Sequence, residues 1–238
     1  MLELKNVSFE KDNKKILDDI NFILEDNSFV VITGKNGSGK STLAKIIMGI
    51  EKPTTGSIVL DNFDITQKEI DERANLGISY AFQQPVKFKG ITVENLIKLS
   101  AKKKINRKEV CDILSKVGLC ANEYSKREVN GQLSGGELKR IEIASVIAKE
   151  SKIILFDEPE AGIDLWSFNN LINTFKELRK NISGAIVVIS HQEKIINIAD
   201  KVILMNEGKI EKTYNKDSLH EVLASSICCK LQGGAHNG

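Results

Sequence analysis

A glycine-rich segment near the start of the chain has the residues needed to bind a phosphate chain. Residues 34–41 match the pattern G-x-x-x-x-G-K-[ST] and lie between an apolar run and a segment with helical periodicity. Glycines let successive backbone N–H groups turn toward phosphate oxygens, and the start of the following helix adds partial positive charge. The residues expected to contact a nucleotide are Gly34, Lys35, Asn36, Gly37, Ser38, Gly39, Lys40, Ser41 and Thr42.

Three of these residues have more specific expected contacts. Lys40 is expected to reach the β and γ phosphates, and the hydroxyl of Ser41 is the expected Mg²⁺ ligand. Thr42 is expected to help hold the α phosphate. A nucleoside triphosphate with Mg²⁺ is therefore the expected ligand.

A second chemical feature is a pair of acids after the apolar run 153–156. Asp157 is expected to organise the water around Mg²⁺, and Glu158 to polarise the water that attacks the γ phosphate. Phosphoryl transfer mainly needs positioning and charge neutralisation, which these groups supply. Two acids here could also simply cap a turn, but beside a phosphate-binding loop they predict nucleotide hydrolysis.

A third feature is the pentapeptide Leu133-Ser134-Gly135-Gly136-Glu137, which precedes a helical pattern at residues 138–149. A serine and two glycines at a helix start can bind a second anion. With all three features in this order, the chain resembles the nucleotide-binding ATPases of the ATP-binding cassette (ABC) superfamily over residues 2–212.

The resemblance implies that the nucleotide is ATP and that ATP binding joins two copies of the chain head to tail, as a homodimer. One copy would then close over the nucleotide that the other copy holds. The residues that the resemblance assigns to this second half of the site are Ser134, Gly135, Gly136 and Glu137.

The resemblance also implies roles for three residues with weak signals of their own. Gln83 resembles the glutamine that contacts Mg²⁺ and the attacking water, and His191 resembles the histidine that contacts the γ phosphate. Asp164 resembles the aspartate of a loop that crosses between subunits. On their own, Gln83 and His191 would be interpreted as ordinary loop or capping residues.

Within the superfamily, residues 72–78 and 81–86 resemble the SufC-type ATPase of the SUF iron-sulfur cluster assembly system. Glu137 and Glu142, after the two glycines, also resemble that branch, whereas residues 158–161 depart from its usual form. The expected partners are therefore soluble SUF scaffold proteins. The alternative is an ATP-binding subunit that works with transmembrane transporter subunits.

Two features leave ligand questions open. Many ABC ATPases stack adenine on an aromatic ring just after the first strand, but Lys11 lies at that position and Phe9 is expected in the core. This departure predicts weak selectivity for adenine over guanine. Near the end of the chain, Cys228, Cys229 and His236 suggest a metal site, but reduced cysteines without a metal are the default interpretation.

The composition excludes several classes of protein. A chain of 238 residues, 41% hydrophobic and 28% charged, is typical of a globular protein. A formal net charge of +2 gives no reason to expect a nucleic-acid partner. No apolar run approaches the roughly 18 residues of a membrane-spanning helix. A cytoplasmic location is expected, at the membrane periphery if the chain serves a transporter.

Hydrophobic periodicity predicts the elements that position these residues. Apolar runs predict buried parallel strands at residues 29–33, 153–156 and 185–190. Alternation predicts a flanking antiparallel layer at residues 2–10, 21–25 and 57–61. A helix is expected at 41–49 and a hairpin at 201–212.

These elements predict a single α/β domain of the P-loop NTPase class, with a RecA-like parallel sheet, a flanking antiparallel β layer and a helical insert. The catalytic core is expected at residues 1–90 and 150–223 and the helical subdomain at 91–149. A short tail is expected at 224–238.

Overall fold

The computed structural model describes residues 1–84, 86–181, 184–216 and 218. The expected tail at residues 224–238, with Cys228, Cys229 and His236, lies outside the described residues.

A six-stranded sheet in the order β10-β9-β3-β8-β7-β6 forms the centre of the molecule. Every neighbouring pair is parallel except the hairpin β9–β10. The strands are β3 (Phe29–Gly34), β6 (Ile78–Ala81), β7 (Ile153–Asp157), β8 (Ala185–Ile189), β9 (Lys201–Asn206) and β10 (Lys209–Asn215). Four of them, β3, β6, β7 and β8, are buried along their whole length, so they lack polar alternation. The predicted α/β fold with a parallel sheet is confirmed.

A four-stranded antiparallel sheet in the order β2-β1-β4-β5 flanks this core. Its strands are β1 (Leu2–Lys11), β2 (Lys14–Leu24), β4 (Thr55–Leu60) and β5 (Phe63–Asp64). The predicted start of β2 at residue 21 is wrong. The β1–β2 pairing shifts register repeatedly and Asp19 has a positive φ of 52°, so regular alternation is lost in the first part of β2.

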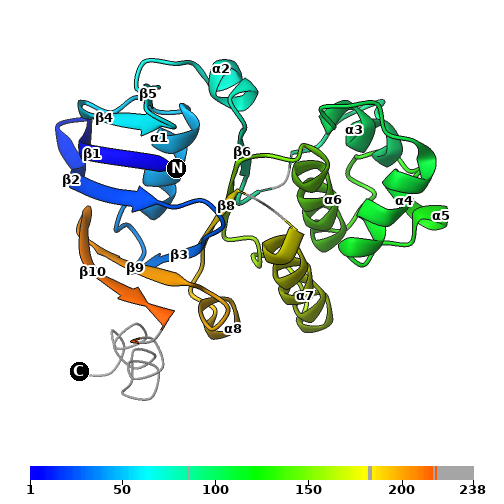
Figure 1. Cartoon of the computed structure of the whole chain (residues 1–238). Coiled ribbons are helices and arrows are strands. Elements are labelled where there is room, and N and C mark those ends of the chain that lie inside the picture. The colour runs from blue at the N-terminus through cyan, green and yellow to red at the C-terminus, as the bar shows by residue number, and fades with distance from the viewer. Residues whose placement is uncertain (85, 182–183, 217, 219–238) are drawn as a thin grey trace.

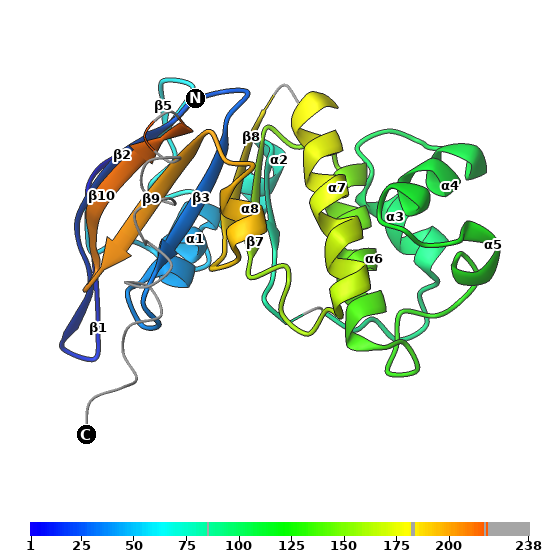
Figure 2. The same ribbon diagram turned by 90° about the horizontal axis from the view of Figure 1, so that it is seen from below.

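Helices separate and cover the sheets. Helix α1 (Lys40–Met48) lies between the two sheets, and α6 (Gly135–Ala148) and α7 (Leu165–Asn181) lie on the other side of the central sheet (Figures 1 and 2). This arrangement gives two apolar cores, one on each face of the central sheet. The shorter α2 (Ile70–Asn75) and α8 (Glu193–Ile196) pack near the sheet.

Four helices form the region farthest from the antiparallel sheet (Figure 2). They are α3 (Val93–Ser100), α4 (Arg107–Lys116), α5 (Ala121–Tyr124) and α6. Helix α6 begins at Gly135 and not at the predicted residue 138. Ser134 caps it, and the Glu137 carboxylate accepts a bond from the Ser134 N–H, which stabilises a first turn that contains two glycines.

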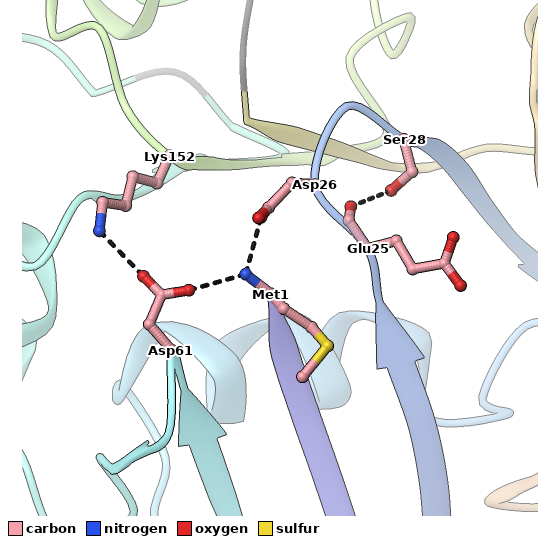
Figure 3. A network of polar contacts seen from close by, with 6 residues as sticks. All are labelled: Met1, Glu25, Asp26, Ser28, Asp61 and Lys152. Carbon is pink, nitrogen blue, oxygen red and sulfur yellow. Dashed lines mark hydrogen bonds and ion pairs between the residues drawn. The ribbon is translucent and has the colours of Figure 1, made fainter.

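A polar network ties the start of the chain to two turns (Figure 3). The Met1 amine lies 2.7 Å from Asp26 and 2.8 Å from Asp61, and Lys152 reaches the other oxygen of Asp61 at 2.9 Å. These groups are solvent-exposed, so each ion pair contributes less than about 1 kcal/mol. The network connects the antiparallel layer with the segment that leads into β7.

Across the described ranges, no helix combines the length and apolar character that crossing a bilayer requires.

Candidate active site

A cleft of about 690 Å³ lies beside the loop that joins β3 to α1. This loop leaves the carboxyl end of a central parallel strand, where ligands commonly bind in α/β folds. The residues that line the cleft are Lys14, Lys15, Ile16, Asn36, Gly37, Gly39, Lys40, Ser41, Thr42, Gln83, Glu158, Glu207 and Gly208.

The loop needs glycine at two places for close packing. Gly34 has φ 142°, and a Cβ there would lie 2.0 Å from the carbonyl oxygen of Met205 on β9. Gly39 has φ 96°, and its Cβ would lie 2.6 Å from the Leu17 side chain. Gly39 is also the N-cap of α1 and offers no side-chain acceptor, so the first N–H groups of the helix stay available for an anion.

Lys40 folds back over this loop. Its ammonium donates to the carbonyl oxygens of Gly34 at 2.8 Å and Lys35 at 2.9 Å, and only 5% of the residue is exposed. Burial lowers the pKa of Lys40, and the carboxylates of Glu158 and Asp157 oppose this effect. A bound polyphosphate would add negative charge beside this buried ammonium and favour its charged form.

The loop also holds a buried polar atom that lacks a partner. Ser38 Oγ is inaccessible to solvent and makes no hydrogen bond within the described part of the chain. Since buried hydroxyls are nearly always bonded, this orphan fits a loop shaped around a ligand oxygen.

Asp157, at the end of β7, is held from two sides. The Ser41 hydroxyl donates to Asp157 Oδ1 at 2.9 Å, and the Tyr80 hydroxyl donates to Oδ2 at 2.7 Å. The carboxylate belongs to a residue that is only 2% exposed. Burial, followed by the bond to Asp157, raises the pKa of Tyr80, so its hydroxyl remains a donor.

Hydroxyl and carboxylate oxygens are the ligand types that Mg²⁺ prefers, so Ser41 and Asp157 fit this ion. Among the residues that the structure describes, no group of three His, Cys, Asp or Glu could hold a metal. An ion at Ser41 and Asp157 would therefore take its remaining ligands from phosphate oxygens and water, which is usual for Mg²⁺.

Glu158 and Gln83 meet across the same cleft. Gln83 Nε2 donates to Glu158 Oε2 at 2.5 Å. Glu158 has φ 44°, an uncommon conformation for a residue with a side chain, and its N–H donates to the Ile189 carbonyl at 3.0 Å. The strand end thus places the carboxylate beside the phosphate loop.

His191 follows β8 and lies near the loop. Its Nδ1 is 3.5 Å from Thr33 Oγ1 on β3. Burial and then the charge of Lys40 lower the pKa of His191 below its usual 6.5, while Glu158 opposes them. The imidazole is therefore neutral at pH 7 and can both donate and accept a hydrogen bond.

Two groups of predicted site residues do not line this cleft. Gly34, Lys35, Ser38, Asp157 and His191 belong to the phosphate loop or contact residues beside it, whereas residues 134–137 and Asp164 belong to other segments. Ser134 Oγ accepts from the N–H of Glu137 at 3.2 Å, and Glu137 Oε2 accepts from the N–H of Ser134 at 2.7 Å. The other oxygen of Glu137 accepts from the Tyr124 hydroxyl at 2.5 Å. Asp164 accepts bonds from the N–H and the hydroxyl of Ser167 at the start of α7. One chain alone therefore separates residues 134–137 and Asp164 from the phosphate loop.

The structure adds residues that sequence reasoning missed. Tyr80 bonds Asp157, and a tyrosine inside the apolar run of β6 could have indicated a buried hydrogen-bond partner. The turn with Glu207 and Gly208 also lines the cleft, and the Gly208 N–H donates to the Ser38 carbonyl at 3.2 Å. The hairpin at residues 201–212 was predicted, but no local pattern places its turn at the cleft, because the parallel pairing of β9 with β3 brings it there.

Aromatic rings are absent from the described lining of the cleft, which contains no Phe, Tyr or Trp. Lys11 pairs with Glu51 at 3.0 Å, and Phe9 is 6% exposed in the core, as predicted. Weak selectivity for adenine stays a prediction.

Comparison with known proteins gives consistent similarities. The family model described as "ABC transporter" matches residues 17–161. The chain is 38% identical to an uncharacterized ABC transporter ATP-binding protein of Methanocaldococcus jannaschii, over 90% of this chain and 88% of that protein. It is 35% identical to the energy-coupling factor transporter ATP-binding protein EcfA2 of Clostridium acetobutylicum, over 88% of this chain and 78% of that protein.

A solved structure shares the fold. It is a dimeric, post-hydrolysis state of the ATP-binding cassette MJ0796 bound to ADP and Pi. The TM-score is 0.81 at 26% identity, over 91% of this chain and 99% of that one.

Proposed function

The chain belongs to the ABC transporter family, and from this membership we propose that it is the ATP-binding subunit that powers a membrane transporter. The protein is an ATPase that hydrolyses ATP to ADP and phosphate with Mg²⁺. The observation that carries the proposal is the cleft beside the phosphate-binding loop. Lys40, Ser41, Gln83 and Glu158 line it, Ser41 bonds Asp157, and Gln83 bonds Glu158.

The proposed chemistry follows from these contacts. The phosphate loop and Lys40 would bind the phosphate chain. Ser41, Asp157 and Gln83 would hold Mg²⁺, which would supply charge neutralisation when bound. Glu158 accepts a proton from, or orients, the attacking water, and Gln83 fixes its carboxylate at 2.5 Å. Neutral His191 supplies a hydrogen bond to the γ phosphate.

A second copy of the chain completes this site. Residues 134–137 lie outside the cleft of their own chain, yet they form a glycine-containing helix start that suits an anion. Head-to-tail pairing brings them to the nucleotide of the other copy. ATP thus stabilises a closed homodimer, and hydrolysis reopens it.

An apolar groove beside Gln83 is the proposed docking site for the transmembrane partner. The groove has a volume of about 410 Å³ and lies among β6, α3, α6 and the side chains of Phe82, Val86 and Phe88. Its walls include large apolar side chains that are partly exposed, namely Phe82, Val86, Phe88 and Leu99. If closure of the ATP-bound homodimer moves the walls of this groove, a partner bound in the groove would move with them.

The cluster-assembly alternative rests on residues 72–78 and 81–86 together with Glu137 and Glu142. The Glu142 carboxylate accepts from the Phe82 N–H at 2.8 Å, so in this chain it has a structural role beside Gln83. The relatives named above are described as transporter proteins, which favours a transporter.

Affinity purification from the native host tests the proposal. The tagged chain is isolated gently and the proteins that copurify are identified by mass spectrometry. Multi-span membrane proteins are the expected result. Soluble scaffold proteins together with iron would instead support the cluster-assembly alternative and overturn the transporter role.

A matched pair of variants tests the docking groove in the same experiment. Leu99 lies in the groove and is 73% exposed, and Phe63 lies outside it on β5 and is 72% exposed. Leu99→Lys is expected to lose the partner while basal ATPase activity remains. Phe63→Lys is expected to retain both. Equal recovery of the partner by the two variants would contradict the groove assignment.

A further inference from the structure

Tyr80 brings a polar atom into a strand that is otherwise closed to water. Strand β6 is buried along its whole length, and Tyr80 itself is 9% exposed. Its hydroxyl is 2.7 Å from Asp157 Oδ2. β6 is the edge strand next to β7, so this bond joins the ends of two neighbouring strands.

The two oxygens of Asp157 have donors of different kinds. Ser41, which donates to Oδ1, belongs to the phosphate loop, and its hydroxyl is needed for Mg²⁺ when the nucleotide binds. Tyr80 belongs to the scaffold and does not line the nucleotide cleft. The bond from Tyr80 can therefore persist when the bond from Ser41 is exchanged.

This persistent bond restricts how Asp157 can rotate. The terminal torsion of an aspartate is broad and has roughly two-fold preference, so the backbone alone does not set the plane of its carboxylate. A charge-assisted bond from a phenol is strong and directional. With Oδ2 held by Tyr80, Oδ1 remains directed at the Ser41 side of the cleft.

The same side chain also reaches the apolar groove. The Tyr80 ring packs edge-on against Phe82, with centroids 4.8 Å apart and an interplanar angle of 69°. Both rings line the groove, and Phe82 is 40% exposed. The α6 residues Glu142 and Lys139 bond the Phe82 N–H and carbonyl, which fixes this end of the wall.

We propose that Tyr80 is a positioning residue for magnesium: its hydroxyl sets the orientation of the Asp157 carboxylate, and its ring links that carboxylate to the wall of the apolar groove. The proposal rests on the proposed role of Asp157 at Mg²⁺. It does not depend on which partner occupies the groove.

Tyr80→Phe removes the hydroxyl and keeps the ring. ATP affinity of the purified full chain is measured by calorimetry, once with Mg²⁺ and once with a chelator. The gain in affinity that Mg²⁺ produces is expected to fall about tenfold, the equivalent of about 1.4 kcal/mol and typical of a bond to a charged group. Affinity in the chelator is expected to stay within about twofold of wild type, because the phosphate loop is untouched.

ATPase activity provides a second readout. The Mg²⁺ concentration for half-maximal turnover is expected to rise in Tyr80→Phe, with most of the maximal rate recovered at saturating Mg²⁺. A purely structural defect would instead lower ATP affinity equally with and without Mg²⁺, and that result would overturn the proposal.

Two further variants keep the outcomes distinct. Ser79→Ala removes a hydroxyl that is also buried in β6 but bonds Ser151 at 2.5 Å, and it is expected to leave the Mg²⁺ dependence unchanged. Asp157→Asn tests the underlying role of Asp157. If Asp157→Asn weakens Mg²⁺-dependent binding and Tyr80→Phe does not, the inference about Tyr80 fails alone. If neither does, the assignment of Asp157 to Mg²⁺ fails as well.

Discussion

The nucleotide cleft and the signature segment, residues 133–137, differ in how their polar groups are hydrogen-bonded. In and beside the cleft, contacts join β3, α1, β6, β7 and the segment after β8, and Ser38 Oγ is buried without a partner within the described ranges. In the signature segment, Ser134 and Glu137 satisfy each other through a reciprocal capping box. The cleft thus keeps a buried hydroxyl unbonded, whereas the signature segment is complete as a helix start.

The two regions depend on different kinds of contact. The cleft depends on tertiary contacts between distant strands, so folding alone assembles it. The signature segment is positioned by local bonds at the start of α6, which suits its proposed role as the half of the site that a second copy supplies. Variants in the two regions should therefore fail in different ways.

The largest expected effect is on turnover. Glu158→Gln removes the carboxylate but keeps a side chain of the same shape beside Gln83, so ATP still binds. ATPase activity is expected to fall by about 10²- to 10³-fold, typical of a lost general base. Gel filtration with ATP should show an accumulated dimer. Turnover at the wild-type rate would remove Glu158 from its proposed role.

Next in size is the effect on nucleotide affinity. Lys40→Ala removes the buried ammonium that bridges the Gly34 and Lys35 carbonyls, and calorimetry should show ATP affinity reduced by about 10²-fold. Lys45→Ala, in the last turn of the same helix, is the matched control and should bind ATP normally. Wild-type affinity in Lys40→Ala would contradict the assignment of the loop.

A variant in the signature segment should separate binding from dimerisation. Ser134 does not line the cleft of its own chain, so Ser134→Arg should bind ATP within about twofold of wild type. The arginine should nevertheless block closure, and the ATP-dependent dimer should be lost in gel filtration. Ser115→Arg, at an exposed position on α4, controls for an added charge in the helical region. A normal dimer in Ser134→Arg would exclude the head-to-tail arrangement.

The same contrast explains which features could be predicted from sequence. The central strands β3, β7 and β8 are continuous apolar runs, and a loop with a fixed pattern connects β3 to helix α1. The fold class and the phosphate loop were therefore predictable. The start of β2 was not predicted, because the register shifts in its pairing with β1 interrupt the two-residue alternation of apolar and polar side chains. The predicted site residues remain proposals.

Long-range contacts were the main features that the sequence did not predict. The bond between Tyr80 and Asp157 spans 77 residues, and Gln83 meets Glu158 across 75 residues, so no local pattern encodes either distance. The start of α6 is different, because the spacing of Ser134 and Glu137 matches the capping-box signature. Reading that signal as a helix start would have moved the predicted boundary from residue 138 to its observed place.

The smallest expected effect tests whether Glu137 serves its helix or a ligand. The hydrogen bond from Tyr124 lowers the pKa of Glu137, burial opposes this shift, and the Ser134 N–H supports it. The pKa of Glu137 in the folded protein lies below the ordinary 4.5. Its contribution to the free energy of unfolding is therefore fully present above pH 4.5 and is lost as the pH falls through the lower folded pKa. Glu137 is partly buried, with 18% of its side chain exposed, so its contribution is about 1 kcal/mol. Glu137→Gln should therefore melt slightly earlier than wild type at neutral pH, and the two melting temperatures should converge in acid. A variant with unchanged melting but no ATP-dependent dimer would instead assign Glu137 to the nucleotide of the second copy, and the signature segment would no longer be complete as a helix start.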